Sequence, residues 1–172
     1  MKGKVVPYIP SPRRVVTTAL NEALADRAKL LVDLGSGDGR VLVMAAKYFG
    51  LKAIGYEIDE DLCVLAEVNA RENGVEDLVE VRCESFYNAD LSEANIIYAY
   101  LYSSILERLK PVFKNAPFFS RIVVVDLFIP EWHPVRVRRL LDEAGVMRSV
   151  GVYLRGVSDD PVKTILSHFK PS

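Results

Sequence analysis

The sequence predicts a single α/β domain, built on a mostly parallel seven-stranded sheet with helices on both faces and a C-terminal antiparallel hairpin. The chain has 172 residues, of which 50% are hydrophobic and 26% charged, as expected for one domain that closes its own core. From residue 30 onward, short apolar runs alternate with helical stretches, which is typical of parallel strands joined by crossover helices. The middle runs lack polar alternation, as strands buried on both faces do.

The N-terminal elements follow from proline and from helical spacing. Residues 1–11 are predicted to form an extended arm, because Pro7 and Pro10 disfavour helical backbone at the residues before them. Ser11 is expected to cap a helix over residues 12–29, with Pro12 in its first turn. Residues 30–172 are expected to form the α/β core.

The elements of this core are predicted in turn from apolar runs and caps. Strands are expected at 30–34, 53–57, 78–82, 95–100 and 121–128, and helices at 41–49, 60–73 and 104–113. A helix is predicted near Pro134–Ala144, after a proline-rich loop. The segments SVGVYLRG and PVKTILSHF flank a VSDD turn, and are expected to pair as the antiparallel hairpin.

Composition narrows the classes of function. The formal net charge is −1 and the pI about 6.2, so a nucleic-acid substrate is disfavoured. The chain shows neither a signal peptide nor a run of 18 apolar residues, and we expect a cytoplasmic protein, favoured as a monomer and without a membrane partner. Cys63 and Cys83 are expected to be buried free thiols, and no metal site is predicted.

A glycine-rich loop follows the first predicted strand and precedes a helix. VDLGSGDGR occupies residues 32–40, with Ser36 between Gly35 and Gly37 and with Gly39 near the end. Ligands of open α/β sheets bind at the carboxyl ends of the strands, and glycines let the backbone approach a ligand closely. The loop is therefore predicted to bind a cofactor. An ordinary tight turn explains one or two glycines but not three followed by a helix.

The residue before this loop indicates the cofactor. A dinucleotide fingerprint needs a third glycine where Arg40 stands. The carboxylate of Asp33 would repel a pyrophosphate, whereas S-adenosylmethionine has no phosphate and presents an ammonium and a sulfonium. The loop therefore favours S-adenosylmethionine. Asp38 either adds to the same negative field or complements the dipole of the following helix.

A second acid ends the next predicted strand. Glu57 stands about twenty residues beyond the loop, where an acid accepts hydrogen bonds from both ribose hydroxyls. The same feature occurs in dinucleotide sites. A solvent-exposed acid at a strand end is the alternative for this residue alone, but its distance from the glycine loop favours the functional interpretation.

These segments resemble a known family. DLGSGDGR followed by GYEID is similar to motifs I and II of class I methyltransferases, whose fold is Rossmann-like. The closer resemblance is to the small archaeal protein-lysine methyltransferases, with Val6–Pro12 similar to their N-terminal arm. Leu91–Ala94 and Tyr98–Tyr102 are similar to the segment after their third strand, and LKPVF, VVVDLFIPEW and GVYLRG extend the resemblance over most of the chain.

The resemblance implies roles for individual residues. Asp33 and the loop glycines Gly35, Gly37 and Gly39 would hold the methionine part of S-adenosylmethionine, and Glu57 the ribose. Ile58 would cover one face of the adenine, and Ser85 and Phe86 its edge. It also implies lysine side chains of proteins as acceptors.

Tyrosines are the candidates for the acceptor side. Methyl transfer from a sulfonium is an in-line displacement by a neutral nucleophile, so the protein mainly aligns donor and acceptor. Tyr98, Tyr100 and Tyr102 cluster at the end of the fourth strand, and aromatic faces attract a lysine chain. The alternative for each is a core or sheet-face tyrosine. Tyr8 is a further candidate, at both the cofactor and the catalytic site, if the arm folds over as a lid.

Three other functions remain open from the sequence. A methyltransferase for a small molecule or RNA is the first, although no NPPY-like or DPPY-like motif follows the fourth strand. A non-catalytic module that binds S-adenosylmethionine and regulates a partner is the second, and a dehydrogenase is a remote third. Nearly all of the chain is expected to form the α/β core, so only a small surface would recognise a protein substrate. We therefore expect broad selectivity for protein substrates.

Overall fold

A seven-stranded sheet forms the centre of the computed structural model, which describes residues 8–160. Its strands are β1 (Leu30–Leu34), β2 (Lys52–Glu57), β3 (Val79–Cys83), β4 (Ile96–Ala99), β5 (Arg121–Val125), β6 (Arg136–Leu141) and β7 (Met147–Leu154). Their order across the sheet is β3-β2-β1-β4-β5-β7-β6. The first five are parallel, and β7 runs antiparallel to both β5 and β6. The predicted fold class is confirmed, including an antiparallel hairpin near the C-terminus.

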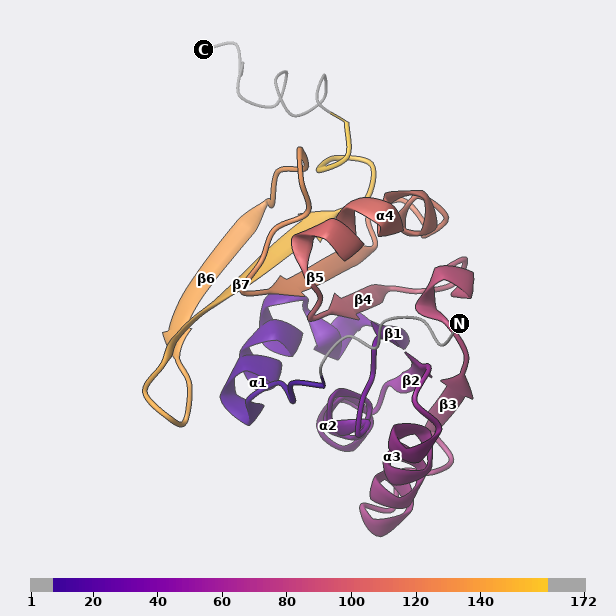
Figure 1. Ribbon diagram of the computed structural model, residues 1–172. Helices are drawn as coiled ribbons and strands as arrows, with labels where there is room; N and C mark the ends of the chain where they lie inside the picture. The colour runs from indigo at the N-terminus through magenta and orange to yellow at the C-terminus, as the bar shows by residue number, and fades with distance from the viewer. Residues whose placement is uncertain (1–7, 161–172) are drawn as a thin grey trace, which may run out of the picture.

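Helices cover both faces of the sheet (Figure 1). They are α1 (Arg13–Glu22), α2 (Arg40–Phe49), α3 (Glu60–Glu72) and α4 (Ser103–Phe113), with short 3-10 turns η1 (Ala25–Arg27) and η2 (Phe86–Asn88). In β1, Leu31 packs in the cluster with α1 and α2, whereas Val32 and Leu34 pack in the cluster with α4. Both faces of this strand are therefore buried, which explains its unbroken apolar run.

The first helix is shorter than predicted. It begins at Arg13 and ends at Glu22, because Leu24 adopts a left-handed backbone with φ 53° and a 3-10 turn follows. Ser11 does not cap it: Pro12 holds the cap position without a side-chain hydrogen bond. The Ser11 hydroxyl instead accepts a hydrogen bond of 2.9 Å from the buried Tyr98 hydroxyl, so this serine ties the arm to β4.

The helix predicted near Pro134–Ala144 is wrong. The chain forms strand β6 there, paired with β7 from Arg136↔Val152 to Leu141↔Met147. Pairing with the following strand β7 outweighs a local pattern that fits a helix. The hairpin is therefore β6–β7, whereas the expected partner segment PVKTILSHF lies outside the described residues.

The two cysteines are not free thiols. Cys63 of α3 and Cys83 at the end of β3 form a disulfide, with a Cα–Cα distance of 6.0 Å across 20 residues of sequence. Their separation in sequence gave no sign of this proximity, which the packing of α3 against β3 creates. The disulfide links the two elements at this edge of the sheet.

The chain order reverses at β1. From β1 it proceeds to β2 and β3 on one side and returns to β4 and β5 on the other. The carboxyl ends of β1, β2 and β4 therefore flank the crevice where ligands bind in such sheets. Within residues 8–160, no helix has the length and apolar character needed to cross a membrane.

Candidate functional site

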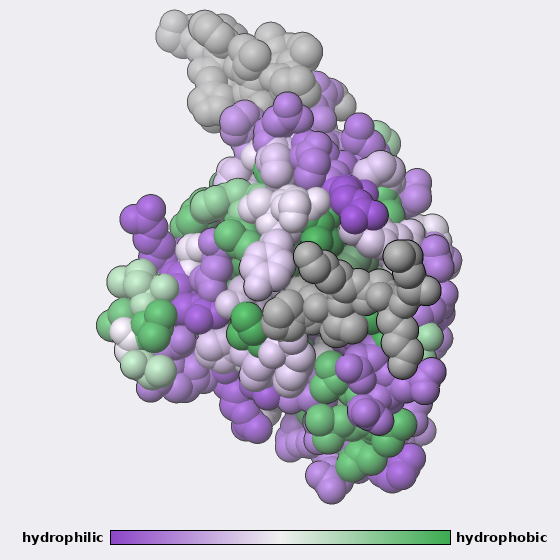
Figure 2. All heavy atoms as spheres, in the orientation of Figure 1, coloured by the Kyte–Doolittle hydropathy of each residue, from purple (hydrophilic) through white to green (hydrophobic). Residues whose placement is uncertain are grey.

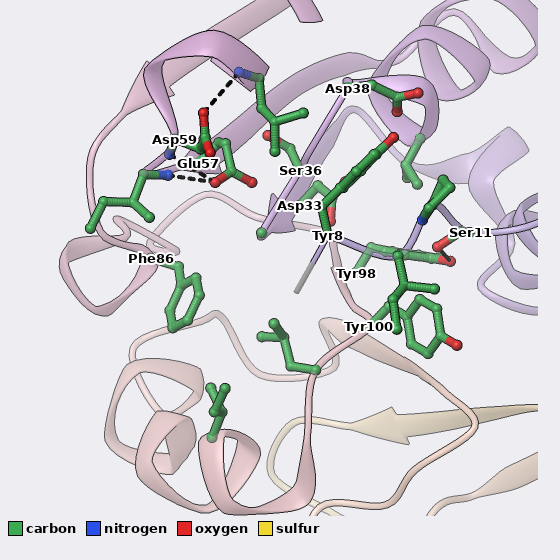
Figure 3. A pocket seen from close by; sticks show the side chains of 18 of the residues that line it. Tyr8, Ser11, Asp33, Ser36, Asp38, Glu57, Asp59, Phe86, Tyr98 and Tyr100 are labelled. Carbon is green, nitrogen blue, oxygen red and sulfur yellow. Dashed lines mark hydrogen bonds between the residues drawn. The ribbon is translucent and has the colours of Figure 1, made fainter. Parts of the chain in front are cut away.

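A cavity of about 430 Å³ opens at this crevice (Figure 3). The sequence-predicted residues that line it are Tyr8, Asp33, Gly35, Ser36, Glu57, Ile58, Ser85, Phe86, Tyr98 and Tyr100. Gly37 and Gly39 are not among the lining residues. The sheet thus brings together residues from five separate segments of the sequence.

Asp33 is the buried acid of the cavity. Strand register places it between Gly55 of β2 and Tyr98 of β4, and its exposed fraction is 2%. Burial raises the pKa of the Asp33 carboxyl well above its ordinary value, and the charges of Glu57 and Asp38 raise it further. An ammonium group beside Asp33 would stabilise the ionised carboxylate, so the site fits a cationic ligand.

The three glycines of the loop have positive φ but different surroundings. Gly35 has φ 89° and lines the cavity. Gly37 donates its N–H to a Glu57 carboxylate oxygen at 2.9 Å, and a Cβ there would overlap the Tyr8 ring. A Cβ on Gly39 would lie 2.8 Å from that of Ala66. Gly39 therefore serves the packing of α2 against α3, a role that the glycine pattern alone does not reveal.

Glu57 is held in place by backbone donors. One carboxylate oxygen accepts the N–H groups of Ile58 and Asp59 at 2.8 and 3.0 Å, and the other accepts the N–H of Gly37. Asp59 then caps α3 by accepting the N–H groups of Asp61 and Leu62. The acid is thus fixed at the cavity, with a carboxylate able to accept further hydrogen bonds.

Tyr8 lies over the loop, and its ring points toward Asp38 in Figure 3. Burial raises the pKa of the Tyr8 hydroxyl, and the Asp38 carboxylate raises it further. Although burial opposes it, the Arg40 guanidinium lowers the pKa of Asp38 through a forked ion pair of 2.7 Å. Arg40 also donates to the Ser11 carbonyl at 3.2 Å, so Asp38 and Arg40 together anchor the arm beside the cavity.

Aromatic residues form the wall opposite the glycine loop. Ser85 caps η2 by accepting the N–H of Tyr87, and the Phe86 and Tyr87 rings meet edge to face at 4.8 Å. The Arg108 guanidinium of α4 lies 4.9 Å from the centre of the Tyr87 ring. This end of the cavity therefore offers flat apolar surfaces.

The tyrosines at the end of β4 and in the loop after it differ in position. Tyr98 is 1% exposed, and burial raises the pKa of its hydroxyl. The Tyr100 hydroxyl donates to Asp126 at 3.2 Å and accepts from Arg148 at 2.7 Å. Tyr102 does not line the cavity and is 49% exposed. Only Tyr98 and Tyr100 of the three therefore contribute to the cavity.

The other lining residues were not assigned to the site from the sequence, except that one interpretation of Asp38 placed it in the negative field beside the loop. They are Ile9, Pro10, Ser11, Asp38, Arg40, Val41, Asp59, Leu62, Tyr87, Leu101, Ile105 and Arg108. Leu101 and Ile105 come from the loop after β4 and the start of α4, so their signal was the strand-to-helix junction itself. The Ser36 hydroxyl is buried without a hydrogen-bond partner among residues 8–160, a polar group that a ligand would satisfy.

The chain matches a family model over most of this site. The ANTKMT methyltransferase domain model matches residues 33–136 of the 172. The chain belongs to the ANTKMT methyltransferase family. It is an S-adenosylmethionine-dependent methyltransferase, as the motif resemblance and the acidic glycine loop predicted.

Two curated relatives are similar to this chain over most of its length. The protein-lysine N-methyltransferase of Saccharolobus islandicus is 33% identical over 88% of this chain and 94% of its own length. The adenine nucleotide translocase lysine N-methyltransferase of Mus musculus is 34% identical over 77% of this chain. The match covers 58% of the mouse protein's length.

A solved structure shares both fold and sequence. The RNA methyltransferase of Salinibacter ruber, in complex with S-adenosyl-L-homocysteine, is 36% identical with a TM-score of 0.78. The likeness covers 88% of this chain and 98% of that one. Its bound product agrees with the cofactor class assigned to this family member.

Proposed function

We propose that this protein transfers the methyl group of S-adenosylmethionine to lysine ε-amines of proteins, with broad selectivity. The observation that carries the proposal is one continuous cavity, which extends from the acids Asp33 and Glu57 to the tyrosines Tyr98 and Tyr100. Two curated relatives bear the name of lysine N-methyltransferase, which supports the same acceptor.

The acidic end of the cavity suits the cofactor. Asp33 and the loop backbone at Gly35 and Ser36 would bind its methionine part, and Glu57 its ribose hydroxyls. Ile58, with Ser85 and Phe86, would bind the adenine. When bound there, S-adenosylmethionine supplies an electrophilic methyl group on its sulfonium.

The aromatic end of the cavity suits a lysine side chain. An ammonium must lose its proton before it reacts, and desolvation lowers the pKa of a lysine. The Tyr98 and Tyr100 rings would guide the alkyl chain and attract its cationic head. Tyr8 would close over both ligands and exclude water, which favours alignment of the reacting atoms.

RNA is the second candidate acceptor. The observation in its favour is the Salinibacter ruber neighbour, an RNA methyltransferase 36% identical to this chain. Against it stand the formal net charge of −1 and the few cations among the described lining residues, which are Arg40, paired with Asp38, and Arg108.

The experiment is methyl transfer to competing acceptors. Purified protein is incubated with tritiated S-adenosylmethionine and with equal amounts of mixed protein or total RNA, and the methylated residues are identified by mass spectrometry. We expect label on lysines of many proteins, lost in Asp33→Ala and retained in the control Asp77→Ala, which changes an exposed acid away from the cavity. Label on RNA alone would overturn the lysine proposal, and label on one protein only would overturn broad selectivity.

A further inference from the structure

A groove of about 490 Å³, separate from the cofactor cavity, lies between α1 and β6. Its lining residues are Arg14, Thr18, Asn21 and Glu22 of α1, and Arg138, Arg139, Leu140 and Leu141 of β6. The four α1 residues recur at helical spacing, so one face of the helix forms a wall and the strand forms the other.

Two arginines of this groove carry unneutralised charge. Arg14 and Arg139 are exposed, and neither side chain has an ion-pair partner among residues 8–160. Glu22 is already engaged, by Arg136 at 3.0 Å and Arg138 at 4.0 Å. The carboxylate of Glu143 accepts the backbone N–H of Arg14 at 2.7 Å. The free cations of the groove therefore favour an anionic ligand.

The groove and the cofactor cavity approach each other in two places. Ser11 lines the cavity and Arg14 lines the groove, and three residues of chain span at most about 11 Å. Leu140 of the groove is the register partner of Arg148, whose guanidinium donates to the Tyr100 hydroxyl of the cavity at 2.7 Å. A chain bound in the groove would thus pass close to the acceptor end of the cavity.

The strand side of the groove is suited to a polypeptide. β6 is the edge strand among the described residues, and an exposed edge offers backbone groups to an added strand. The tip of the β6–β7 hairpin also exposes Leu141, Val146 and Met147 by 51%, 50% and 61%. Figure 2 shows this tip as a green patch at the left of the molecule. The open edge of β6, the apolar hairpin tip and the arginines of the groove fit an extended acidic peptide better than they fit RNA.

We propose that this groove binds an extended acidic segment of the protein substrate, adjacent to the lysine that enters the cavity. The proposal rests on the lysine acceptor proposed above. On the bound of about 11 Å from Ser11 to Arg14, the first acidic residue would stand about three positions from the lysine and the next ones up to about five, because an extended chain rises about 3.3 Å per residue.

The test compares two synthetic peptides. Each has one central lysine, with glutamates three to five positions away on both sides in the first and glutamines at the same places in the second. Binding is measured by fluorescence anisotropy, and kcat/KM by tritium transfer, for wild type, Arg14→Glu, Arg139→Glu and the control Arg71→Glu. Arg71 is an exposed arginine of α3, outside both the groove and the cavity.

We expect wild type and Arg71→Glu to prefer the glutamate peptide by about three- to tenfold in kcat/KM, since exposed ion pairs are individually weak. The two groove variants should lose or reverse this preference and still methylate the glutamine peptide at the wild-type rate. The same preference for the glutamate peptide in all four proteins would overturn the proposal that the groove binds the acidic segment. Binding that depends on Arg139 without lysine methylation would support the groove and overturn the lysine acceptor. Tighter, Arg139-dependent binding of a labelled oligouridylate would assign the groove to RNA and overturn the peptide.

Discussion

At the scale of single residues, Tyr100 joins the cavity to a partly buried charge network. Its hydroxyl lies between Asp126 and Arg148, which pair with each other at 2.8 Å. Asp126 has a left-handed backbone with φ 61°, stabilised by hydrogen bonds in both directions with Ser149. Such backbone strain is retained where surrounding contacts over-determine the conformation. The network holds the Tyr100 ring in one orientation at the proposed acceptor end of the cavity.

Substitution of Tyr100 tests what the ring contributes. In Tyr100→Phe the hydroxyl's hydrogen bonds to Asp126 and Arg148 are lost, but these two charged groups still pair with each other. Because the aromatic face remains, kcat/KM for a lysine peptide should fall no more than about threefold. In Tyr100→Leu the face is lost, and kcat/KM should fall about 5- to 30-fold, because a desolvated cation–π contact contributes about 1–2 kcal/mol. Steady-state kinetics measure both, with thermal unfolding as the check on folding. Equal kinetics in the two variants would contradict an aromatic role.

At the scale of elements, the arm and the glycine loop form one contact. Gly37 has φ 52° and Gly50 has φ 67°, so both need a conformation that L-residues adopt at a cost. A Cβ on Gly37 would overlap the Tyr8 ring, whereas one on Gly50 would meet nothing within 4 Å. Comparing substitutions at Gly37 and Gly50 therefore separates the effect of backbone strain from the effect of displacing Tyr8.

Alanine at each position is the corresponding experiment. Gly37→Ala and Gly50→Ala should both lower the free energy of unfolding by about 1–2 kcal/mol. Only Gly37→Ala should also weaken S-adenosylhomocysteine binding and slow methyl transfer, because it displaces Tyr8 and the N–H that Glu57 accepts. Calorimetric titration and chemical denaturation measure the two effects. An unchanged affinity in Gly37→Ala would show that the Tyr8 contact is dispensable.

The disulfide is the second link between elements, and its removal should be measurable. Closing a loop of this length stabilises a fold by about 2–4 kcal/mol, so a reductant should lower Tm by about 5–15 °C for a domain of this size. Cys83→Ser should unfold at the Tm of the reduced wild type and respond no further to the reductant. A wild-type Tm that stays constant while thiol titration reports two free cysteines would refute this stabilisation.

At the scale of the whole molecule, the sequence predicted those elements that a contiguous run of residues marks. The strands buried on both faces, and the glycine loop between β1 and α2, could be located because their apolar runs and turn residues are contiguous. β6 could not, because its local pattern fits a helix and its pairing with the following strand β7 decides its structure. The Cys63–Cys83 disulfide could not, because the packing of α3 against β3 brings together two cysteines 20 residues apart. In the site, Asp33 and Glu57 were predictable from their place at strand ends. The partners of Gly37 and Gly39, Tyr8 and Ala66, follow only from how the arm and α3 pack.

The charge of Asp33 couples the whole fold to pH. Burial, then the charges of Glu57 and Asp38, raise the pKa of Asp33 well above the ordinary value. Between that ordinary value and the raised pKa, the folded cofactor-free protein holds a proton that the unfolded chain has lost. The free energy of unfolding contributed by this group is therefore highest below the ordinary pKa, and it falls as pH rises toward the raised pKa. An ammonium at Asp33 favours the ionised carboxylate, so cofactor binding should release a proton. The affinity for the cofactor should therefore increase as pH rises between the ordinary and the raised pKa of Asp33.

Asp33→Asn removes this coupling, which makes it the decisive variant. Without cofactor it should be more stable than wild type at neutral pH, since a carboxylate whose pKa is raised by burial is replaced by an amide. Its affinity for S-adenosylhomocysteine should be about 10- to 100-fold lower, because a hydrogen bond to a charged group contributes about 1.5–3 kcal/mol. Thermal unfolding from mildly acidic to neutral pH, with and without S-adenosylhomocysteine, measures both effects, with Asp77→Asn as the exposed control. In wild type and the control, the rise in Tm on adding cofactor should grow with pH, whereas in Asp33→Asn it should stay small and constant. A pH dependence that survives in Asp33→Asn would assign the coupling to another group, and would remove the electrostatic basis for placing the cofactor's ammonium beside β1.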